Sequence, residues 1–365
     1  MKILHTESSD GWGGQEMRVV AEMQGLRSRG HVLELAAPAS ARIHREAAAL
    51  GFRVHDVPIA RKSLRGVFAM RELLQRERFD VVNTHSSPDS WLTVLANVLS
   101  AHPVPLVRTR HTTAAVSRKP TTSWVYQRSA AIVTTGEQLR QALIDVNGFR
   151  MPIRSVPTGV DPARFGPADP VAARAALGLP ELFTVGIVAG VRSWKGHRYL
   201  VEAVQQLHQQ GRVLQLLIVG DGPRMQEVQA QVAAAGLGEI VRFVGHDPQP
   251  ERWMRAMDLF VLPSYANEGV PQALMQAMLS GLPCVTTHVG CISEIAHDGR
   301  TAVVVPTQDS AAVARAIAGL MDDPARRDSL GRAARALALE RCTLDVMCDA
   351  MEEVFRSVVA GAARA

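Results

Sequence analysis

The chain has 365 residues, of which 47% are hydrophobic and 21% charged, and this composition excludes an intrinsically disordered protein. The length exceeds what one hydrophobic core usually serves, so two domains are expected. The net charge of +5 is uneven, because residues 1–165 carry 22 Lys and Arg against 14 Asp and Glu, whereas residues 166–365 carry 18 against 21. The basic first half predicts an anionic partner there, such as an acidic acceptor or a membrane surface.

The chain gives no sign of a targeting or membrane-spanning segment. It begins with a strand-like segment at 2–5 and lacks a basic stretch leading into an apolar one, so we expect no secretory signal. No apolar run reaches the ~18 residues that a membrane span needs. A cytoplasmic protein is therefore expected. The basic charge is not accompanied by a nucleic-acid-binding motif, so nucleic acid is not an expected partner.

Short β-branched segments alternate with longer helical patterns along the whole chain, which predicts βαβ units and parallel sheets. In the first half we expect strands at 2–5, 32–36, 54–57, 81–84, 106–109, 132–135 and 154–156. In the second half we expect strands at 183–189, 214–219, 240–244, 259–262, 284–286 and 302–305. The fold class is therefore α/β, with two Rossmann-like, doubly wound parallel sheets.

A segment at 156–167 interrupts this pattern with three prolines and two glycines, which is typical of an interdomain hinge. We expect a first domain at 1–165, joined by a C-terminal helix within 344–365, and a second domain at 166–343. Because open α/β sheets bind ligands at the carboxyl ends of their strands, the two sheets are expected to face each other across a ligand-binding cleft.

The first expected strand ends in a Gly-rich loop that contains Gly13 and Gly14 and leads into a helix. Backbone amides at a helix start can approach a phosphate or a sugar hydroxyl closely, so both glycines are candidates for donor binding. Glu16 follows them and is a candidate for contacting the acceptor. The alternative interpretation is a tight strand-to-helix turn. The loop is not a G-x-G-x-x-G fingerprint, which gives little support to a nicotinamide cofactor.

Two histidines, His85 and His111, follow expected strands of the first half. A histidine at the carboxyl end of a strand faces the ligand-binding edge, where it can hydrogen-bond a sugar hydroxyl or a phosphate. Each of them alone is as readily structural as functional, but their shared position favours a functional role.

The first strand of the second half leads into a loop with Arg192 and Lys195, and a helix begins near Gly196. An Arg and a Lys three residues apart, beside a helix N-terminus, form a suitable pyrophosphate clamp. The alternative is two solvated charges on a surface loop.

The segment at 263–278 follows another expected strand of the second half. Pro271 suits the first helical position, which leaves the amides of Gly269 and Val270 free to face a phosphate at the helix start. Glu268 lies just ahead of this start, and Gln276 lies about one and a half turns along the helix. The two side chains are therefore placed to contact opposite ends of one elongated ligand.

Taken together, these features resemble glycosyltransferase family 4, a family of retaining enzymes with the two-domain GT-B fold. The match rests, in chain order, on Gly13-Gly14, the hinge phrase at 156–161 with Phe165, the loop from Arg192 to Gly196, and Glu268 with the helix behind it. Supporting phrases lie at 218–223, 241–245 and 281–285. The resemblance covers nearly the whole chain.

The resemblance implies a role for each matching position. Arg192 and Lys195 would neutralise the diphosphate of a nucleotide-sugar donor, and Glu268 would address the donor sugar. Backbone near Gly245 would meet the base, and His111 would lie near the reacting sugar. One position departs from the family: the second acid of its Glu-x7-Glu motif is Gln276 here. An amide still offers an acceptor for the ribose hydroxyls and adds donors, so we interpret Gln276 as a subgroup variation.

The resemblance predicts a retaining transfer of a sugar onto a hydroxyl of a glycan or glycolipid acceptor, of the lipopolysaccharide or surface-polysaccharide type. No D-x-D motif occurs in the chain, and Arg192 and Lys195 would replace a metal, so neither a metal site nor another cofactor is expected. The alternatives are a GT-B sugar-nucleotide epimerase and a non-catalytic two-domain sugar-binding protein.

Three cations at Arg61, Lys62 and Arg65 alternate with apolar residues in the basic first half. This pattern is typical of a peripheral contact with an anionic membrane surface. An ordinary solvated helix start explains it equally well.

Overall fold

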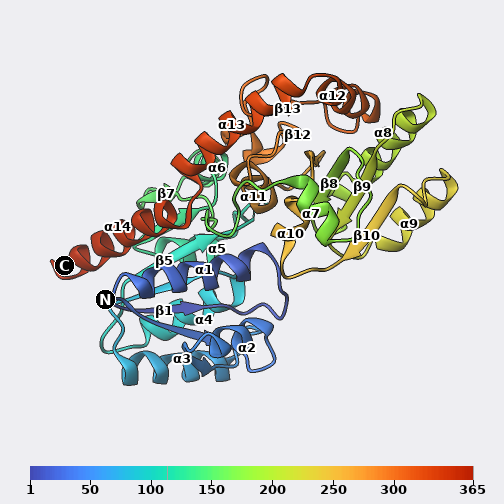
Figure 1. Cartoon of the computed structure of the whole chain (residues 1–365). Helices are drawn as coiled ribbons and strands as arrows, with labels where there is room; N and C mark the ends of the chain where they lie inside the picture. Colours follow the sequence, from blue (N-terminus) through green and yellow to red (C-terminus); the bar gives the residue numbers. More distant parts are fainter. Residues whose placement is uncertain (113, 365) are drawn as a thin grey trace. The chain divides into compact units, whose positions relative to one another are not determined.

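The computed structural model describes residues 1–112 and 114–364, and its strands form two sheets in which neighbouring strands run parallel (Figure 1). The first sheet has seven strands in the order β3-β2-β1-β4-β5-β6-β7. They are β1 (Lys2–Thr6), β2 (Val32–Ala37), β3 (Arg53–Asp56), β4 (Val81–Thr84), β5 (Leu106–Arg110), β6 (Ala131–Thr134) and β7 (Ile153–Ser155). The second sheet has six strands in the order β10-β9-β8-β11-β12-β13. They are β8 (Thr184–Val188), β9 (Gln215–Val219), β10 (Val241–Gly245), β11 (Leu259–Leu262), β12 (Cys284–Thr286) and β13 (Val303–Val304).

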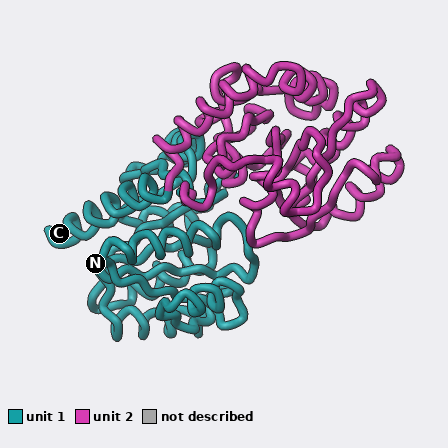
Figure 2. The backbone as a smooth tube through the Cα atoms, viewed as in Figure 1, with its two compact units in different colours: residues 1–159, 344–365 teal, residues 160–343 magenta. Residues whose placement is uncertain are grey.

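The chain divides into two compact units, shown in teal and magenta in Figure 2. Unit 1 contains Met1–Gly159 and the chain from Leu344 onward, and unit 2 contains Val160–Thr343. The change of unit lies within the expected hinge at 156–167 and slightly before the expected boundary after 165, because the Val160 amide donates to the Cys342 carbonyl at 2.9 Å and ties this segment to unit 2. Residues 344–364 of the expected 344–365 segment are described, and Ala365 lies outside the described residues.

In unit 1, alternate residues of the strands enter separate cores on the two faces of the sheet. Ile3 packs with α1 (Gly14–Ser28) and α14 (Leu344–Ala362), whereas Leu4 packs with α3 (Leu64–Glu77) and α4 (Ser87–Val98). Gly25 lets α14 approach α1 closely, because a Cβ there would overlap the Cys348 sulfur. The remaining helices of the unit are α2 (Arg42–Ala49), α5 (Pro120–Gln127) and α6 (Glu137–Asp145).

In unit 2, the helix α8 (His197–Gln209) packs against α9 (Met225–Ala234) and α12 (Ser310–Asp322). The helix α11 (Gln272–Leu279) packs against α13 (Pro324–Arg341). Two shorter helices, α7 (Pro170–Ala176) and α10 (Pro250–Met254), complete the unit. Within the described chain, no helix combines the length and the apolar character needed to cross a membrane.

Each sheet has one point where the strand order reverses. In unit 1 it lies between β1 and β4, and in unit 2 it lies between β8 and β11. Loops leaving the carboxyl ends of the two strands diverge there, which makes this point the usual ligand site of open parallel sheets. The loops after β1, β4, β8 and β11 carry most of the residues that the sequence singled out.

Candidate functional site

In unit 2, the reversal point brings Lys195 and Glu268 into contact. Lys195 ends the short 3-10 helix η1 (Ser193–Lys195) after β8, and Glu268 lies in the loop after β11. The Lys195 Nζ donates to Glu268 Oε1 at 2.7 Å and to Oε2 at 2.9 Å. The Ser264 hydroxyl also donates to Oε1, at 2.6 Å. The Glu268 side chain is only 5% exposed, so its charge is held by these two partners.

The two loops are fixed to each other by their backbones as well. The Tyr265 amide donates to the Trp194 carbonyl at 2.9 Å. Gly196, with φ +78°, leaves no room for a side chain, because a Cβ would overlap the Pro263 carbonyl. Gly196 therefore sets how closely the Lys195 loop approaches the Glu268 loop.

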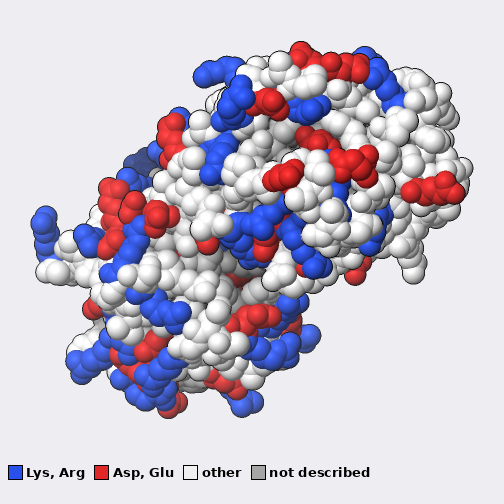
Figure 3. Space-filling model, viewed as in Figure 1, with Lys and Arg blue, Asp and Glu red and all other residues white. Residues whose placement is uncertain are grey.

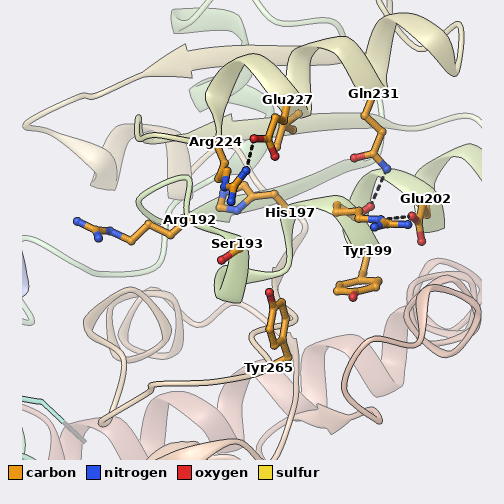
Figure 4. Close-up of a pocket in the computed structure, with 11 residues that line it drawn as sticks. Arg192, Ser193, His197, Tyr199, Glu202, Arg224, Glu227, Gln231 and Tyr265 are labelled. Carbon is orange, nitrogen blue, oxygen red and sulfur yellow. Dashed lines mark hydrogen bonds and ion pairs between the residues drawn. The ribbon is translucent and has the colours of Figure 1, made fainter. Parts of the chain in front are cut away.

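Arg192 lies at the start of the same loop and is exposed. Its guanidinium lies 5.3 Å from the centre of the Trp194 ring, and it forms no ion pair with a described residue. In Figure 4 its side chain points away from the other labelled residues. Arg192 thus offers an unneutralised positive charge beside the Lys195–Glu268 pair.

The start of α11 lies directly behind Glu268. The structure corrects one detail of the prediction: Pro271 is the N-cap residue, and Gln272 is the first helical residue. Val270 and Pro271 are buried, and Gly269 and Gln276 are half-buried. A helix N-terminus next to Lys195 and Arg192 adds positive potential to this edge of the sheet.

Gly245 ends β10, on the same carboxyl edge but beyond β9. Its carbonyl accepts the Gly220 amide at 2.7 Å, and its φ of +75° is one that glycine adopts without strain. A Cβ placed on Gly245 would meet no other atom within 4 Å, so the backbone is open on that side.

A cavity of about 540 Å³ lies between α8 and α9 (Figure 4). Arg192 is the only predicted site residue on its wall; Lys195 and Glu268 do not line it. Tyr199 and Tyr265 meet edge to face there at 6.0 Å. His197, also on the wall, is buried, and neither ring nitrogen has a hydrogen-bond partner among the described residues. Burial, and secondarily Lys195, lowers the pKa of His197 to about 4.

In unit 1, three histidines from adjacent strands form a hydrogen-bonded row. His5 Nδ1 lies 2.9 Å from His85 Nε2, and His85 Nδ1 lies 2.9 Å from His111 Nε2. His5 lies within β1, and the other two follow β4 and β5. The structure thus brings the predicted His85 and His111 together and adds His5. Sequence analysis missed His5 because a lone histidine inside a strand is indistinguishable from a core residue.

Two buried carboxyl groups beside this row were also missed. Glu7 follows β1, and its carboxylate accepts the Ser86 hydroxyl at 2.5 Å and the Gln15 amide at 2.5 Å. Asp89 accepts the Thr6 hydroxyl at 2.6 Å. Burial, with a further contribution from Asp89, raises the pKa of Glu7 to about 7. Their positions after β1 and β4 are the signal that points to them.

The Gly-rich loop after β1 forms the start of α1. Gly13 is the N-cap residue and Gly14 the first helical residue. The Gly13 amide donates to the Glu16 carboxylate at 2.8 Å, and Glu16 is 5% exposed. The Glu16 side chain therefore caps the helix, and its acceptor-side role stays a prediction.

The start of α3 carries an exposed basic and apolar patch, formed by Arg61, Lys62, Leu64, Arg65 and Phe68. Leu64 is 77% exposed and Phe68 59%. The Lys62 ammonium lies 4.3 Å from the centre of the Trp91 ring. On the face seen in Figure 3, Lys and Arg of unit 1 are interspersed with Asp and Glu, so the basic excess forms no single-sign surface on that face.

The described residues contain no cluster of three or more His, Cys, Asp or Glu side chains arranged to hold a metal ion. Cys284, Cys291, Cys342 and Cys348 are buried free thiols.

Comparison with known proteins matches both halves of the chain. Residues 12–164 match the family model described as Glycosyltransferase Family 4, and residues 181–323 match the model described as Glycosyl transferases group 1. The 2-deoxystreptamine glucosyltransferase of Streptomyces kanamyceticus is 27% identical, over 85% of this chain and 89% of its own. The lipopolysaccharide core biosynthesis mannosyltransferase LpcC of Rhizobium leguminosarum bv. viciae is 31% identical, over 68% and 70%.

The structure of Anabaena Alr3699/HepE in complex with UDP matches 98% of this chain and 100% of its own, with a TM-score of 0.87 at 21% identity. This likeness shows the fold, which is the expected GT-B arrangement of two Rossmann-like parallel-sheet domains. Together, the family models and the relatives show that this chain is a glycosyltransferase and belongs to glycosyltransferase family 4.

Proposed function

We propose that this glycosyltransferase moves a sugar from a nucleoside diphosphate sugar onto a hydroxyl of a glycan or glycolipid acceptor, with retention of the anomeric configuration. The observation that carries the proposal is the Lys195–Glu268 pair at the reversal point of unit 2, with the unpaired Arg192 beside it. Two similar proteins support it: HepE was solved with UDP-glucose, and LpcC is named for lipopolysaccharide core biosynthesis. Synthesis of lipopolysaccharide or another surface polysaccharide is therefore the proposed context.

The donor binds to unit 2 in this proposal. Arg192 and Lys195 neutralise the diphosphate, and the amides of Gly269 and Val270 at the start of α11 add hydrogen-bond donors. The base lies toward Gly245, and Gln276 contacts the ribose. Glu268 accepts hydroxyls of the donor sugar, because its buried carboxylate is already held in place by Ser264 and Lys195.

The chemical step needs little from the protein beyond orientation and charge. The bond between the anomeric carbon and the diphosphate oxygen breaks, and the acceptor hydroxyl forms a new bond on the same face of the sugar. The hydroxyl proton passes to the departing diphosphate oxygen. Negative charge grows on the diphosphate as it leaves, so Arg192 and Lys195 stabilise the transition state more than the bound donor.

We propose further that these two cations make a divalent metal unnecessary and that no other cofactor takes part. An ammonium and a guanidinium supply fixed positive charge where a metal-dependent enzyme uses its ion. The proposal is checked by activity in EDTA.

The acceptor binds to unit 1 in this proposal, at the edge that carries His85 and His111. The patch of Arg61, Lys62, Leu64, Arg65 and Phe68 contacts an anionic membrane surface, which fits a lipid-linked acceptor on the cytoplasmic face. The exposed side chains of Leu64 and Phe68 insert into the membrane interface. The three cations of the patch attract the anionic headgroups.

The function is tested by incubating the protein with α-linked UDP-, GDP- and ADP-sugars and a panel of glycan and glycolipid acceptors, with and without EDTA. Proton NMR of the product reports the anomeric configuration. The proposal expects an α-linked product from one donor in EDTA. A β-linked product overturns retention, and an epimerised donor without transfer overturns the acceptor reaction.

A further inference from the structure

The histidine row of unit 1 continues past His5 to a buried ion pair on α1. His5 Nε2 lies 3.9 Å from Glu22 Oε1, and the Arg18 Nε lies 3.6 Å from Glu22 Oε2. The side chains of His5, Arg18 and Glu22 are fully buried. At the other end, His111 is half-buried, and its Nδ1 has no hydrogen-bond partner among the described residues.

All three imidazoles are neutral in the folded protein. Burial, and then Arg18, lowers the pKa of His5 to about 3. Burial is also the main cause that lowers the pKa values of His85 and His111 well below the usual range. A neutral imidazole has one nitrogen that donates and one that accepts. Two hydrogen bonds in series therefore force all three rings into the same tautomer.

The contacts of Glu22, at the buried end of the row, decide which tautomer the three rings adopt. Asn83 donates its side-chain amide to Glu22 Oε1 at 3.3 Å, and its own carbonyl accepts the Thr109 hydroxyl at 2.8 Å. Glu22 is thus an acceptor between Asn83 and Arg18, and an ionised carboxylate attracts a proton on the facing His5 Nε2. In the opposite tautomer, with the proton on Nδ1 of each ring, the lone pair of His5 Nε2 would face the negative charge of Glu22 in a medium that screens charge poorly.

We propose that Glu22, acting through His5 and His85, holds His111 with its proton on Nε2, so that Nδ1 presents a lone pair to the substrate. His111 then donates from Nε2 to His85, and His85 donates from Nε2 to His5. The proton on His5 Nε2 faces Glu22 Oε1 at 3.9 Å, an electrostatic contact and not a hydrogen bond. His5, His85 and Glu22 are positioning residues, and His111 is the group that meets the ligand. The ligand must offer a proton donor, such as a sugar hydroxyl, at this place.

A specificity follows, and this part rests on the proposed function. A carboxylate or a methoxy oxygen at the position facing His111 would bring lone pair against lone pair. The site therefore selects a sugar that carries a free hydroxyl there and rejects the corresponding uronic acid or methyl ether.

The tautomer is tested on the free protein by long-range proton–nitrogen correlation NMR with ¹⁵N-histidine labelling. The spectrum is recorded at pH 8, because burial raises the pKa of Glu22 to about 7 and the carboxylate must be ionised. The H111N substitution assigns the His111 signal. The proposal expects protonated Nε2 and unprotonated Nδ1 in His5, His85 and His111. Protonated Nδ1 in any of them, or a mixture of tautomers at His111, overturns it.

Whether Glu22 sets the tautomer of the three histidines is tested with the E22Q variant. Glutamine presents an amide donor as readily as an acceptor, so His111 in E22Q is expected to populate both tautomers. E34Q is the matched control, since Glu34 is also buried in unit 1 and lies 2.5 Å from His55 Nε2. An unchanged His111 in folded E22Q overturns the role of Glu22. If E22Q does not fold, the wild-type tautomers still decide the proposal. Because no substrate is needed, the NMR result is independent of whether the transfer reaction is identified correctly.

Discussion

The Lys195 Nζ lies 2.7 Å and 2.9 Å from the two carboxylate oxygens of Glu268, so one ammonium faces both oxygens of one buried acid. The pair is close to neutral and is held in place by hydrogen bonds within the protein. An ammonium has three N–H donors, and the third remains for a phosphate oxygen. The unpaired Arg192 then supplies most of the net attraction for an anion.

Replacing Glu268 should separate nucleotide binding from transfer. In E268Q the carboxylate is lost but the side-chain shape is kept, so we expect kcat to fall about 100-fold while nucleotide diphosphate affinity stays within about threefold. Steady-state kinetics and calorimetry measure the two. The control is E202Q, in which a half-buried α8 carboxylate paired with Arg198 is changed. Wild-type kcat in E268Q would remove Glu268 from the reaction.

Substituting Gly196 should be far more costly than substituting a comparable glycine. In G196A, the methyl group meets the Pro263 carbonyl, so unfolding free energy should fall by about 3 kcal/mol or more. In G211A, φ is similar at +77° but nothing lies within 4 Å, and the expected loss is about 1 kcal/mol. Urea denaturation compares them. Equal losses would mean that the close approach to Pro263 is not what requires glycine at 196.

The buried His197 should make unit 2 sensitive to acid. Its folded pKa of about 4 lies below the usual histidine value of 6.5, so the unfolded chain takes up a proton first as pH falls. Stability is therefore lost as pH drops through this window, by up to about 1.4 kcal/mol per pH unit. In H197L this loss disappears, and an unpartnered polar group is removed. We therefore expect the difference in calorimetric Tm between H197L and the wild type to shift in favour of H197L as the pH is lowered from 6 to 4.5. A constant Tm difference over that range would contradict the assignment.

The patch on α3 should bind anionic vesicles. Exchanging Leu64 and Phe68 together for serine removes apolar insertion, so binding to phosphatidylglycerol vesicles should weaken about tenfold or more, with Tm unchanged because both side chains are exposed. V213S is the control, since Val213 is a 67% exposed residue of unit 2. Flotation in low and high salt measures binding. If the wild-type protein does not float with these vesicles at low salt, the proposal of a membrane contact is wrong.

The strands were predictable because each is a short β-branched run bounded by turn residues, and each lies within about a residue of the expected range. The Lys195 and Glu268 loops were also predictable as neighbours on one sheet edge. Their ion pair was not, because it joins side chains 73 residues apart and depends on rotamers and on the close approach at Gly196.

The buried part of the unit 1 site was beyond sequence reasoning for a different reason. Arg18 and Glu22 are four residues apart on α1, a spacing typical of a solvated surface pair, yet both side chains are fully buried. Arg18 contacts Met351 of α14, and Glu22 contacts Asn83 of β4. His5 likewise gives no sign of its partners, which are His85 after β4 and Glu22 on α1. Only the packing of α14 on α1 reveals that these polar groups form one network.

Calorimetric titration of UDP, GDP and ADP and their sugar conjugates in EDTA tests the central claim most directly, with K195A, R192A and R198A as variants. The account predicts that one nucleotide diphosphate binds without metal. It also predicts that K195A and R192A each weaken binding roughly 10- to 100-fold, as loss of a charge-assisted hydrogen bond implies, and that R198A, whose exposed guanidinium is paired with Glu202, does not. Binding that needs added metal, or that is unchanged in both K195A and R192A, would contradict the account.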